Sequence, residues 1–568
     1  MATADRETHV SAVRPRSYQD ESYLHGFLGT VCDLQKAAAL QDVVLEVEGR
    51  RFSCHRLVLS AASPYFRAMF TSDMAESRQK TVVLQGLNAC MFGDILSYIY
   101  SGTLHVSMDK VQPLYQAADL LQLDYVRDTC SSYMAMNVER STCVDLYKFA
   151  DVFSVEIVQK QCQQWIARHF TEVSSSEEFC SLSVNQLTEI IRHDELDVKE
   201  ETTVWEAVVR WVQHSRRDRL HHLPILLPHI RFILLTSDDK AAILEHPLVK
   251  EDPGSSEVIR NVVQKGNPDP KPRFGMFTEM ALLLDPTKGL SKEIFFMNPR
   301  KGKYISCTYK PEEFPGATDM TVTSGNDIYV LISCVDQLSL YKYNHAKNVW
   351  EQAGVSSTSR GQIFEYLYAV DEILYCICSA DDGLLLQMRK YNPHTNHWQE
   401  CSQLQFGKPI DDIAILSCGL NLYFMSITEM HCYDPGEDKW YRRTPPMVYP
   451  EFCAAVAMGT EIFCTDYYLT QTMVYNTESD SWQKLKGCPV PENHDEDGAP
   501  GLFVLENQLH ALLTCIGEED EDECHIYVYE RSADAWKDLN VSIPNKRYHA
   551  HDMHCPVARI YLPYLNGT

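Results

Sequence analysis

The spacing of apolar residues changes along the chain, and each change predicts a different kind of structure. From Ser22 to Leu40 apolar residues recur every three or four positions, as on one face of an amphipathic helix. From Asp42 to His55 they alternate on either side of Gly49, which predicts a β-hairpin. A compact α/β module is completed by short helices over 56–63 and 65–71, a third strand over 81–84, and helices over 88–100, 110–121 and 124–137.

The spacing then stays helical from Thr142 to about Val263, which predicts an all-α segment. Residues 266–272 carry three prolines, which interrupt helices and favour an extended chain. Beyond Phe274 the pattern becomes one of short strands. We therefore expect a disordered N-terminus (1–21), the α/β module (22–137), the all-α segment (138–265), a linker (266–273) and an all-β region (274–568).

An internal repeat runs through this last region. An aromatic or apolar residue is followed seven positions later by Trp or Tyr, at Met297/Tyr304, Tyr343/Trp350, Tyr391/Trp398, Tyr433/Trp440, Tyr475/Trp482 and Tyr529/Trp536. One strand is expected to end near the first residue of each pair and the next to begin near the second, across a turn rich in Asn, Asp, Gly and Pro. Four-stranded units arranged radially cover one another's faces, so six copies predict a six-bladed β-propeller. We expect a strand within Met553–Leu562 to close the ring by joining the first blade.

Charge and cysteine usage narrow the possible partners and the compartment. The formal net charge is −27, which argues against nucleic acid as the main partner because phosphate binding needs clustered Lys and Arg. The acidity favours basic partners, or it serves solubility alone. No apolar run approaches the roughly 18 residues of a membrane span, and the first twenty residues have no apolar secretory core. The scattered cysteines favour a reducing compartment, so we expect a cytoplasmic or nuclear protein without a membrane partner.

Three motifs carry a resemblance to a known family. The stretch from Asp42 through His55-Arg56 and Tyr65-Phe66 to Met69-Phe70 looks like a BTB (POZ) signature. Leu196–Trp211 is similar to a BACK domain, and the Tyr-to-Trp repeat is similar to kelch repeats. The sequence thus resembles the BTB–BACK–Kelch family, most closely the group named for kelch repeats and BTB domains. It departs from typical kelch repeats in lacking a Gly-Gly pair in the propeller, so the geometry of a substrate face cannot be carried over.

The resemblance implies a non-catalytic adaptor of a cullin-3 RING E3 ubiquitin ligase. In that family the BTB domain dimerises and binds cullin-3, and the propeller recruits a protein substrate for ubiquitination. The alternative is a cytoskeletal or transcriptional scaffold that does not use a cullin. By resemblance, the cullin contact is assigned to Tyr65, Phe70, Met74 and Glu76, together with Val144, Phe149 and Phe153 in the predicted helix 142–153. The dimer face is assigned to Leu24, Phe27, Leu28 and Val31.

Two charged groups have competing interpretations. Asp42 and Arg56 form either a buried charged pair at the dimer surface or an exposed polar pair of little energetic value. Two acidic runs lie between predicted strands of the propeller and form either an acidic rim for a basic substrate motif or solvated loops. The rim would comprise Asp495, Glu496, Asp497, Glu518, Glu519 and Asp520.

The sequence offers little for catalysis or for a cofactor. It contains no Gly-rich phosphate loop, no GxSxG and no HExxH motif. His549, His551, His554 and Cys555 lie close in sequence but lack a second ligand cluster, so we expect no metal. Cys376 and Cys378 have no close Lys or Arg to lower a thiol pKa, which favours buried structural thiols over redox sensors.

Overall fold

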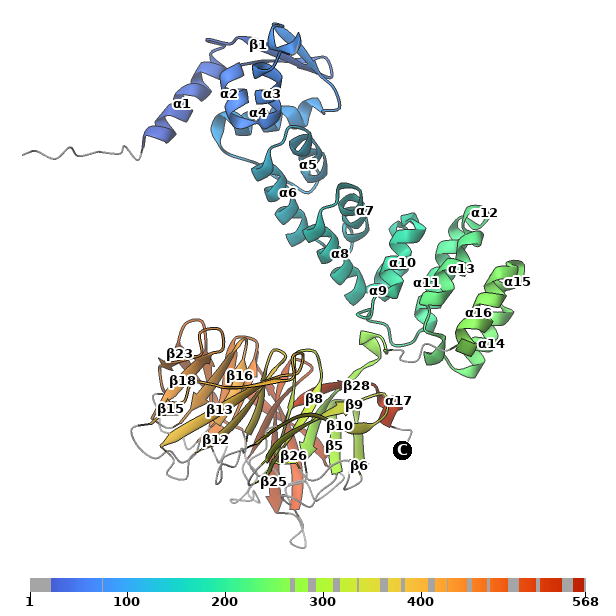
Figure 1. The fold of residues 1–568 in the computed structure, drawn as a ribbon, viewed down its shortest axis with the longest axis vertical. Helices are drawn as coiled ribbons and strands as arrows, with labels where there is room; N and C mark the ends of the chain where they lie inside the picture. The colour runs from blue at the N-terminus through green and yellow to red at the C-terminus, as the bar shows by residue number, and fades with distance from the viewer. Residues whose placement is uncertain are drawn as a thin grey trace, which may run out of the picture. The chain divides into compact units, whose positions relative to one another are not determined.

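The fold was analysed in a computed structural model (Figure 1). The residues that it describes are 22–73, 75–265, 271–284, 293–309, 317–334, 337–357, 366–379, 384–406, 414–426, 428–446, 452–466, 470–488, 500–516, 522–543 and 555–565. The chain divides into two compact units, Met1–Gly275 and Met276–Thr568. Among the helices of these ranges, none is long and apolar enough to cross a membrane.

The first unit begins with a three-stranded sheet in the order β2-β1-β3. β1 (Val43–Val47) pairs antiparallel with β2 (Arg50–Cys54) and parallel with β3 (Thr81–Leu84). Gly49, with φ +77°, supplies the left-handed turn of the hairpin. Alternate residues of β1 are buried, which confirms the predicted alternation. The module also holds α1 (Tyr23–Lys36), α2 (Arg56–Ala62), α3 (Pro64–Thr71), the 3₁₀ turn η1 (Ala75–Ser77), α4 (Ala89–Ser101), α5 (Val111–Leu120) and α6 (Asp124–Met136).

The rest of the first unit is helical, as predicted. Apolar stripes such as Trp205, Val208 and Trp211 are buried, so helix packing forms its core. Its helices are α7 (Cys143–Phe153), α8 (Glu156–Arg168), α9 (Phe170–Ser174), α10 (Val184–Arg192), α11 (Thr202–His214), α12 (Arg216–Arg219), α13 (Leu223–Leu226), α14 (Ser237–Glu245), α15 (Pro247–Glu251) and α16 (Pro253–Lys265). Between them lie the 3₁₀ turns η2 (Glu178–Ser181), η3 (Leu220–His222), η4 (Leu227–His229) and η5 (Phe232–Leu234), and η6 (Phe274–Met276) follows.

The predicted linker is only partly observable. Residues 266–270 lie outside the described residues. Arg273, by contrast, is fully buried in the first unit and is paired with Glu201, so the end of the predicted linker belongs to the helical unit. The predicted linker, residues 266–273, therefore overlaps the helical unit at its C-terminal end.

The second unit is a six-bladed β-propeller. Within its described residues there are six sheets, in the orders β28-β4-β5-β6, β10-β9-β8-β7, β11-β12-β13-β14 (with β15 on β13), β16-β17-β18-β19, β20-β21-β22-β23 and β24-β25-β26-β27. The first three sheets comprise β4 (Thr278–Leu284), β5 (Glu293–Asn298), β6 (Lys303–Thr308), β28 (Val557–Ile560), β7 (Asp319–Val322), β8 (Ile328–Cys334), β9 (Gln337–Asn344), β10 (Val349–Ser357), β11 (Tyr366–Val370), β12 (Ile373–Ser379), β13 (Leu385–Asn392), β14 (His397–Glu400) and β15 (Leu404–Gln405). The other three comprise β16 (Ala414–Cys418), β17 (Asn421–Met425), β18 (Met430–Asp434), β19 (Lys439–Arg443), β20 (Phe452–Met458), β21 (Glu461–Asp466), β22 (Gln471–Asn476), β23 (Ser481–Lys486), β24 (Gly501–Leu505), β25 (Gln508–Ile516), β26 (Asp522–Glu530) and β27 (Ala535–Ser542). The unit also holds η7 (Pro299–Lys301) and α17 (Leu562–Leu565).

The repeat has the predicted geometry in every blade. The two residues of each pair, seven positions apart, are direct cross-strand neighbours in the third and fourth strands, from Met297 opposite Tyr304 to Tyr529 opposite Trp536. Each of the five repeat tyrosines bonds through its hydroxyl to an Asn or Asp five positions later. Each of these acceptors has a positive φ, and Gly302 takes the same position in the degenerate copy. The turn therefore requires a residue that tolerates the left-handed conformation.

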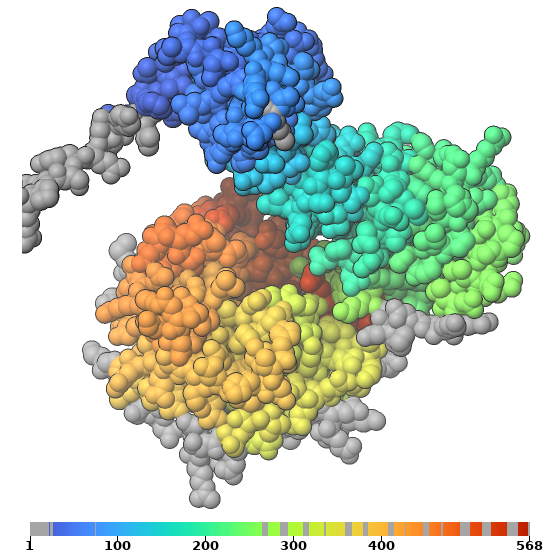
Figure 2. Space-filling view, turned by 45° about the horizontal axis from the view of Figure 1, so that its top comes forward, coloured from blue at the N-terminus to red at the C-terminus, as the bar shows by residue number. Residues whose placement is uncertain are grey.

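Hydrophobic clusters join each sheet to its two neighbours and so complete a ring. In Figure 2 the colour of this unit runs from yellow to red around one face. β28 pairs antiparallel with β4, which confirms that the C-terminal strand joins the first blade. The ring is thus closed by a strand from the opposite end of the unit's sequence, which leaves β4 without an open edge.

Candidate partner-binding site

The helix α3 starts at a fixed point because of Ser63. The Ser63 hydroxyl accepts a hydrogen bond from the Phe66 amide at 3.3 Å and donates one to the Leu121 carbonyl at 2.6 Å. This cap fixes where the helix begins, and Phe66 and Met69 of the helix are buried in the core. Tyr65 and Phe70 are left half-buried on the other side.

Arg56 connects this helix to the turn that carries Glu76. Its guanidinium lies 4.9 Å from the centre of the Phe70 ring, as in a cation–π contact. The same guanidinium donates hydrogen bonds to the backbone carbonyls of Ser77 and Gln79. Phe70 and the residues around Glu76 are therefore held together by one side chain.

The expected Asp42–Arg56 side-chain pair takes a different form. The Asp42 carboxylate is exposed and accepts a hydrogen bond from the Arg56 backbone amide at 2.8 Å. Within the single chain the Arg56 guanidinium is directed to the Ser77 and Gln79 carbonyls, and a charged pair at a dimer surface stays a prediction. Sequence spacing could not show this, because the direction of a long side chain depends on tertiary neighbours.

Tyr65 and Glu76 lie close enough to interact electrostatically. Partial burial raises the pKa of the Tyr65 phenol, and the negative charge of Glu76 raises it further. Tyr65 therefore remains a neutral hydrogen-bond donor beside a carboxylate. The rings of Tyr65 and Phe70, together with the Glu76 carboxylate as acceptor, form a surface that can bind an apolar side chain and a hydrogen-bond donor. Met74, the remaining residue assigned here, lies outside the described residues.

The second group assigned to the cullin contact lies on α7 and is largely buried. Val144 is 3% exposed and Phe149 is 7% exposed. The Phe149 ring packs 5.5 Å from Tyr115 and 4.6 Å from Phe153, centre to centre. We therefore correct the role expected for Val144 and Phe149, which pack in the core rather than on a surface. Phe153 is half-buried.

Two exposed apolar residues near the end of α7 were not singled out from the sequence. Val152 is 74% exposed, and Ile157, in the first turn of α8, is 55% exposed. Both are out of phase with the buried stripe of their helices, and this mismatch is the signal that could have found them.

The residues assigned to the dimer face lie on α1. Phe27 is 55% exposed, Leu28 is 40% exposed, and Val31 is half-buried. The side chain of Leu24 is outside the described residues. Apolar residues gathered on an exposed helix are typical of a protein–protein interface.

Comparison with known proteins bears directly on this unit. The BTB/POZ domain model matches residues 32–137, and the model named "BTB And C-terminal Kelch" (BACK) matches residues 143–244. Human Kelch repeat and BTB domain-containing protein 6 is 24% identical and aligns over 96% of this chain and 86% of its own length. Kelch repeat and BTB domain-containing protein 8 from Xenopus tropicalis is 27% identical and aligns over 92% of this chain and 90% of its own length. Human Kelch repeat and BTB domain-containing protein 12 is also 27% identical and aligns over 95% of this chain and 96% of its own length.

These matches support the BTB–BACK–Kelch family for this chain. The residues around Arg56, Phe70 and Glu76 lie in its BTB domain, and α7 coincides with the start of the BACK match. The relatives are named for kelch repeats, and their alignments extend into the propeller.

The remaining candidates lie in the kelch propeller. All six acidic residues assigned to a substrate rim, Asp495 to Asp497 and Glu518 to Asp520, fall outside the described residues, as do His549, His551 and His554. Within the described ranges, no group of three or more His, Cys, Asp or Glu side chains could hold a metal ion. Cys376 and Cys378 are buried, and burial raises the pKa of the Cys376 thiol, which makes it a poor nucleophile.

Proposed function

We propose that this protein is a substrate-recruiting adaptor of a cullin-3 RING E3 ubiquitin ligase. Its BTB domain binds cullin-3 and a second copy of the chain, and its propeller binds the protein that is ubiquitinated. The adaptor supplies proximity between substrate and the catalytic partners and carries out no chemistry itself. We place this activity in the cytoplasm or the nucleus.

The arrangement around Arg56 supports this proposal most directly. Arg56 holds Phe70 next to the turn of Glu76, and Tyr65 lies beside the same carboxylate. A surface that is already ordered in the single chain loses little conformational freedom on binding. The exposed Val152 and Ile157 extend the apolar area available on the helical segment.

The exposed residues of α1 support a dimer, and dimerisation affects how substrate is held. Burying Phe27 and Leu28 against a second copy would remove apolar surface from water. A dimer carries two propellers, so a substrate with two binding motifs would be held by both. Once the first motif is bound, the second motif binds its propeller at a higher effective concentration. The strongly acidic chain favours substrates with a basic motif.

The test is a binding measurement with the full-length chain and cullin-3. Met74→Ala combined with Glu76→Ala should abolish binding, and light scattering should still show a dimer. Asp94→Ala is the matched control, because it removes one exposed carboxylate of the same domain whose Lys110 partner lies at 3.3 Å and adds little stability.

Two results would contradict this assignment. A double variant that binds normally would place the cullin contact elsewhere, and a double variant that is monomeric would show that these residues belong to the dimer interface. If the wild-type chain does not bind cullin-3, the protein is a scaffold that does not use a cullin.

A further inference from the structure

Residues 271–275 lie against the helical unit. The Phe274 amide donates a hydrogen bond to the Asp194 carbonyl at 3.1 Å, and the Gly275 amide donates one to the Leu196 carbonyl at 3.2 Å. The Lys199 ammonium donates to the Gly275 carbonyl at 3.0 Å. Residues 271–275, which we call the strap, therefore lie along the loop between α10 and α11.

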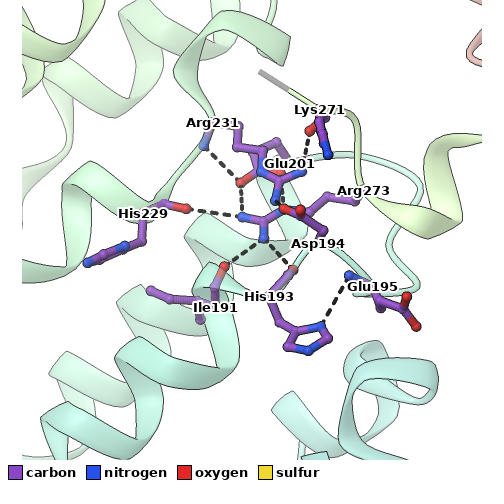
Figure 3. Close-up of polar contacts among 9 residues, drawn as sticks. All are labelled: Ile191, His193, Asp194, Glu195, Glu201, His229, Arg231, Lys271 and Arg273. Carbon is purple, nitrogen blue, oxygen red and sulfur yellow. Dashed lines mark hydrogen bonds and ion pairs between the residues drawn. The ribbon is translucent and has the colours of Figure 1, made fainter. Parts of the chain in front are cut away.

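The guanidinium of Arg273 is the centre of this attachment (Figure 3). It is fully buried, and its two-pronged contact with the Glu201 carboxylate has distances of 3.0 Å from Nε and 2.7 Å from Nη2. The remaining donors reach the carbonyls of Ile191 at 2.6 Å, His193 at 2.9 Å and His229 at 3.1 Å. All five N–H groups are thus used, which an ammonium group could not reproduce.

A second arginine extends the attachment. Glu201 also accepts a hydrogen bond from the Arg231 amide at 2.9 Å. The Arg231 guanidinium pairs with Asp194 and donates to the Lys271 carbonyl at the start of the strap. Loss of the strap would leave Glu201 as a buried charge without Arg273, and such an uncompensated charge is strongly destabilising.

Gly275 allows the strap to lie this close. A Cβ atom at this position would be 2.3 Å from Asp197 Oδ1 and 2.4 Å from the Val198 backbone nitrogen. Because one of these atoms belongs to the backbone, the clash could not be relieved by a change of side-chain rotamer. Any larger residue would lift this end of the strap from the helical unit.

The propeller begins almost immediately after the strap. Phe277 already packs in the second unit, with its ring 6.3 Å from that of Tyr561, and β4 starts at Thr278. Only Met276 separates the last residue attached to the first unit from the first residue attached to the second. Pro272, the last of the three prolines in this stretch, thus lies within the strap that is attached to the helical unit.

We infer that the strap is a positioning element that limits the motion of the propeller relative to the helical unit, and that Arg273, Glu201 and Gly275 are its positioning residues. One residue between two attachments allows much less reorientation than a free eight-residue linker. A bound substrate is then presented from a restrained support, whichever partner the first unit binds. The inference does not depend on cullin binding.

The test measures the distribution of distances between the two units in the full-length chain. Spectroscopic labels are attached through unnatural amino acids at the exposed positions Lys160 and Lys439. We expect a narrow distribution in the wild type and one at least twice as wide in Gly275→Ala. Amide hydrogen exchange at Phe274 should become at least tenfold faster in that variant. Gly254→Ala is the matched control, since its added Cβ would meet atoms no closer than 3.6 Å, and it should match the wild type.

A second variant tests the inference in case Gly275→Ala does not fold. Arg273→Lys keeps the charge opposite Glu201 but removes the two-pronged contact, and it should also widen the distribution and speed exchange at Gly275. The inference is overturned if exchange becomes faster in a folded variant while the distance distribution stays as narrow as in the wild type. The inference is also overturned if the distance distribution of the wild type is already as broad as that of Gly275→Ala.

Discussion

At the scale of single residues, the tyrosines of the propeller repeat combine packing with one specific hydrogen bond. The Tyr433 ring is buried against Trp440, while its hydroxyl donates to Asp438 at 2.6 Å. Asp438 in turn accepts from the Ser402 amide at 2.8 Å, on the segment between β14 and β15. The phenol therefore helps to hold one blade to the next.

We predict that Tyr433→Phe lowers the free energy of unfolding of the propeller by about 1–2 kcal/mol, because a buried hydroxyl bond to a carboxylate is lost while the ring is kept. Urea denaturation measures the change. Tyr441→Phe is the control, since this tyrosine on β19 is 40% exposed and its bond to Glu437 competes with water. Equal losses in the two variants would contradict the prediction.

His510 predicts a pH dependence of stability. The side chain is fully buried, and desolvation lowers its pKa from 6.5 to about 4, although its hydrogen bond to the Gln508 carbonyl opposes this shift. Between these two pH values the unfolded chain binds a proton that the folded chain does not. Stability is therefore complete above about pH 6.5 and falls as the pH falls towards 4, by up to about 3 kcal/mol from this residue.

The measurement is urea denaturation of the wild type and of His510→Asn at several pH values between 7.5 and 4.5. Asparagine can keep the donor to the Gln508 carbonyl but does not titrate. The loss of stability with falling pH should be smaller in the variant. Identical pH profiles would show that His510 is not responsible.

At the scale of elements, the third hairpin of each blade depends on one left-handed residue. In β13 and β14 this residue is Asn396, with φ +51°, and it accepts a hydrogen bond from Tyr391 at 3.0 Å. Backbone conformation and hydrogen bond thus coincide at one position, and substitution can separate the two effects.

We predict that Asn396→Gly lowers the free energy of unfolding by no more than about 1 kcal/mol, because it keeps the conformation and the Tyr391 hydroxyl can still donate to the Ala353 carbonyl at 2.6 Å. Asn396→Val should cost about 1–2 kcal/mol more, because a β-branched residue is strained at this φ. The midpoint temperature of thermal unfolding should fall in the order wild type, Asn396→Gly, Asn396→Val. A Val variant as stable as the Gly variant would rule out a contribution from backbone strain.

At the scale of the whole molecule, the propeller is held closed by a short strand from its C-terminal end. β28 pairs with β4, and Ala558 and Ile560 are each 1% exposed in the cluster between the first two blades. Without β28, β4 would present an open edge and this cluster would be exposed to water.

A chain that ends after Pro556 should therefore lose the cooperative unfolding transition of the propeller and aggregate, whereas the first unit should still unfold as in the full chain. Calorimetry resolves the two transitions. Ile560→Ala is a milder change, and it should lower the free energy of unfolding of the propeller by about 2–4 kcal/mol. A truncated chain with an unchanged propeller transition would show that closure by β28 is dispensable.

The sequence by itself determined the elements and their repetition. Helical and alternating patterns are local, so α3, β3 and the six hairpins could be placed from neighbouring residues alone. Pairing across each turn also follows from local spacing, which is why the residues seven positions apart were found opposite one another. The family resemblance likewise rested on contiguous motifs.

Only the tertiary structure decided which side chains are exposed and which are buried. Val144 and Phe149 were assigned to a binding surface but are buried, and the Phe149 ring packs against Tyr115, which belongs to another helix. Arg273 lies in a proline-rich stretch without periodicity, and its burial depends on Glu201, 72 residues earlier in the chain. Such contacts join distant segments, and their energies depend on burial and geometry that no local pattern encodes.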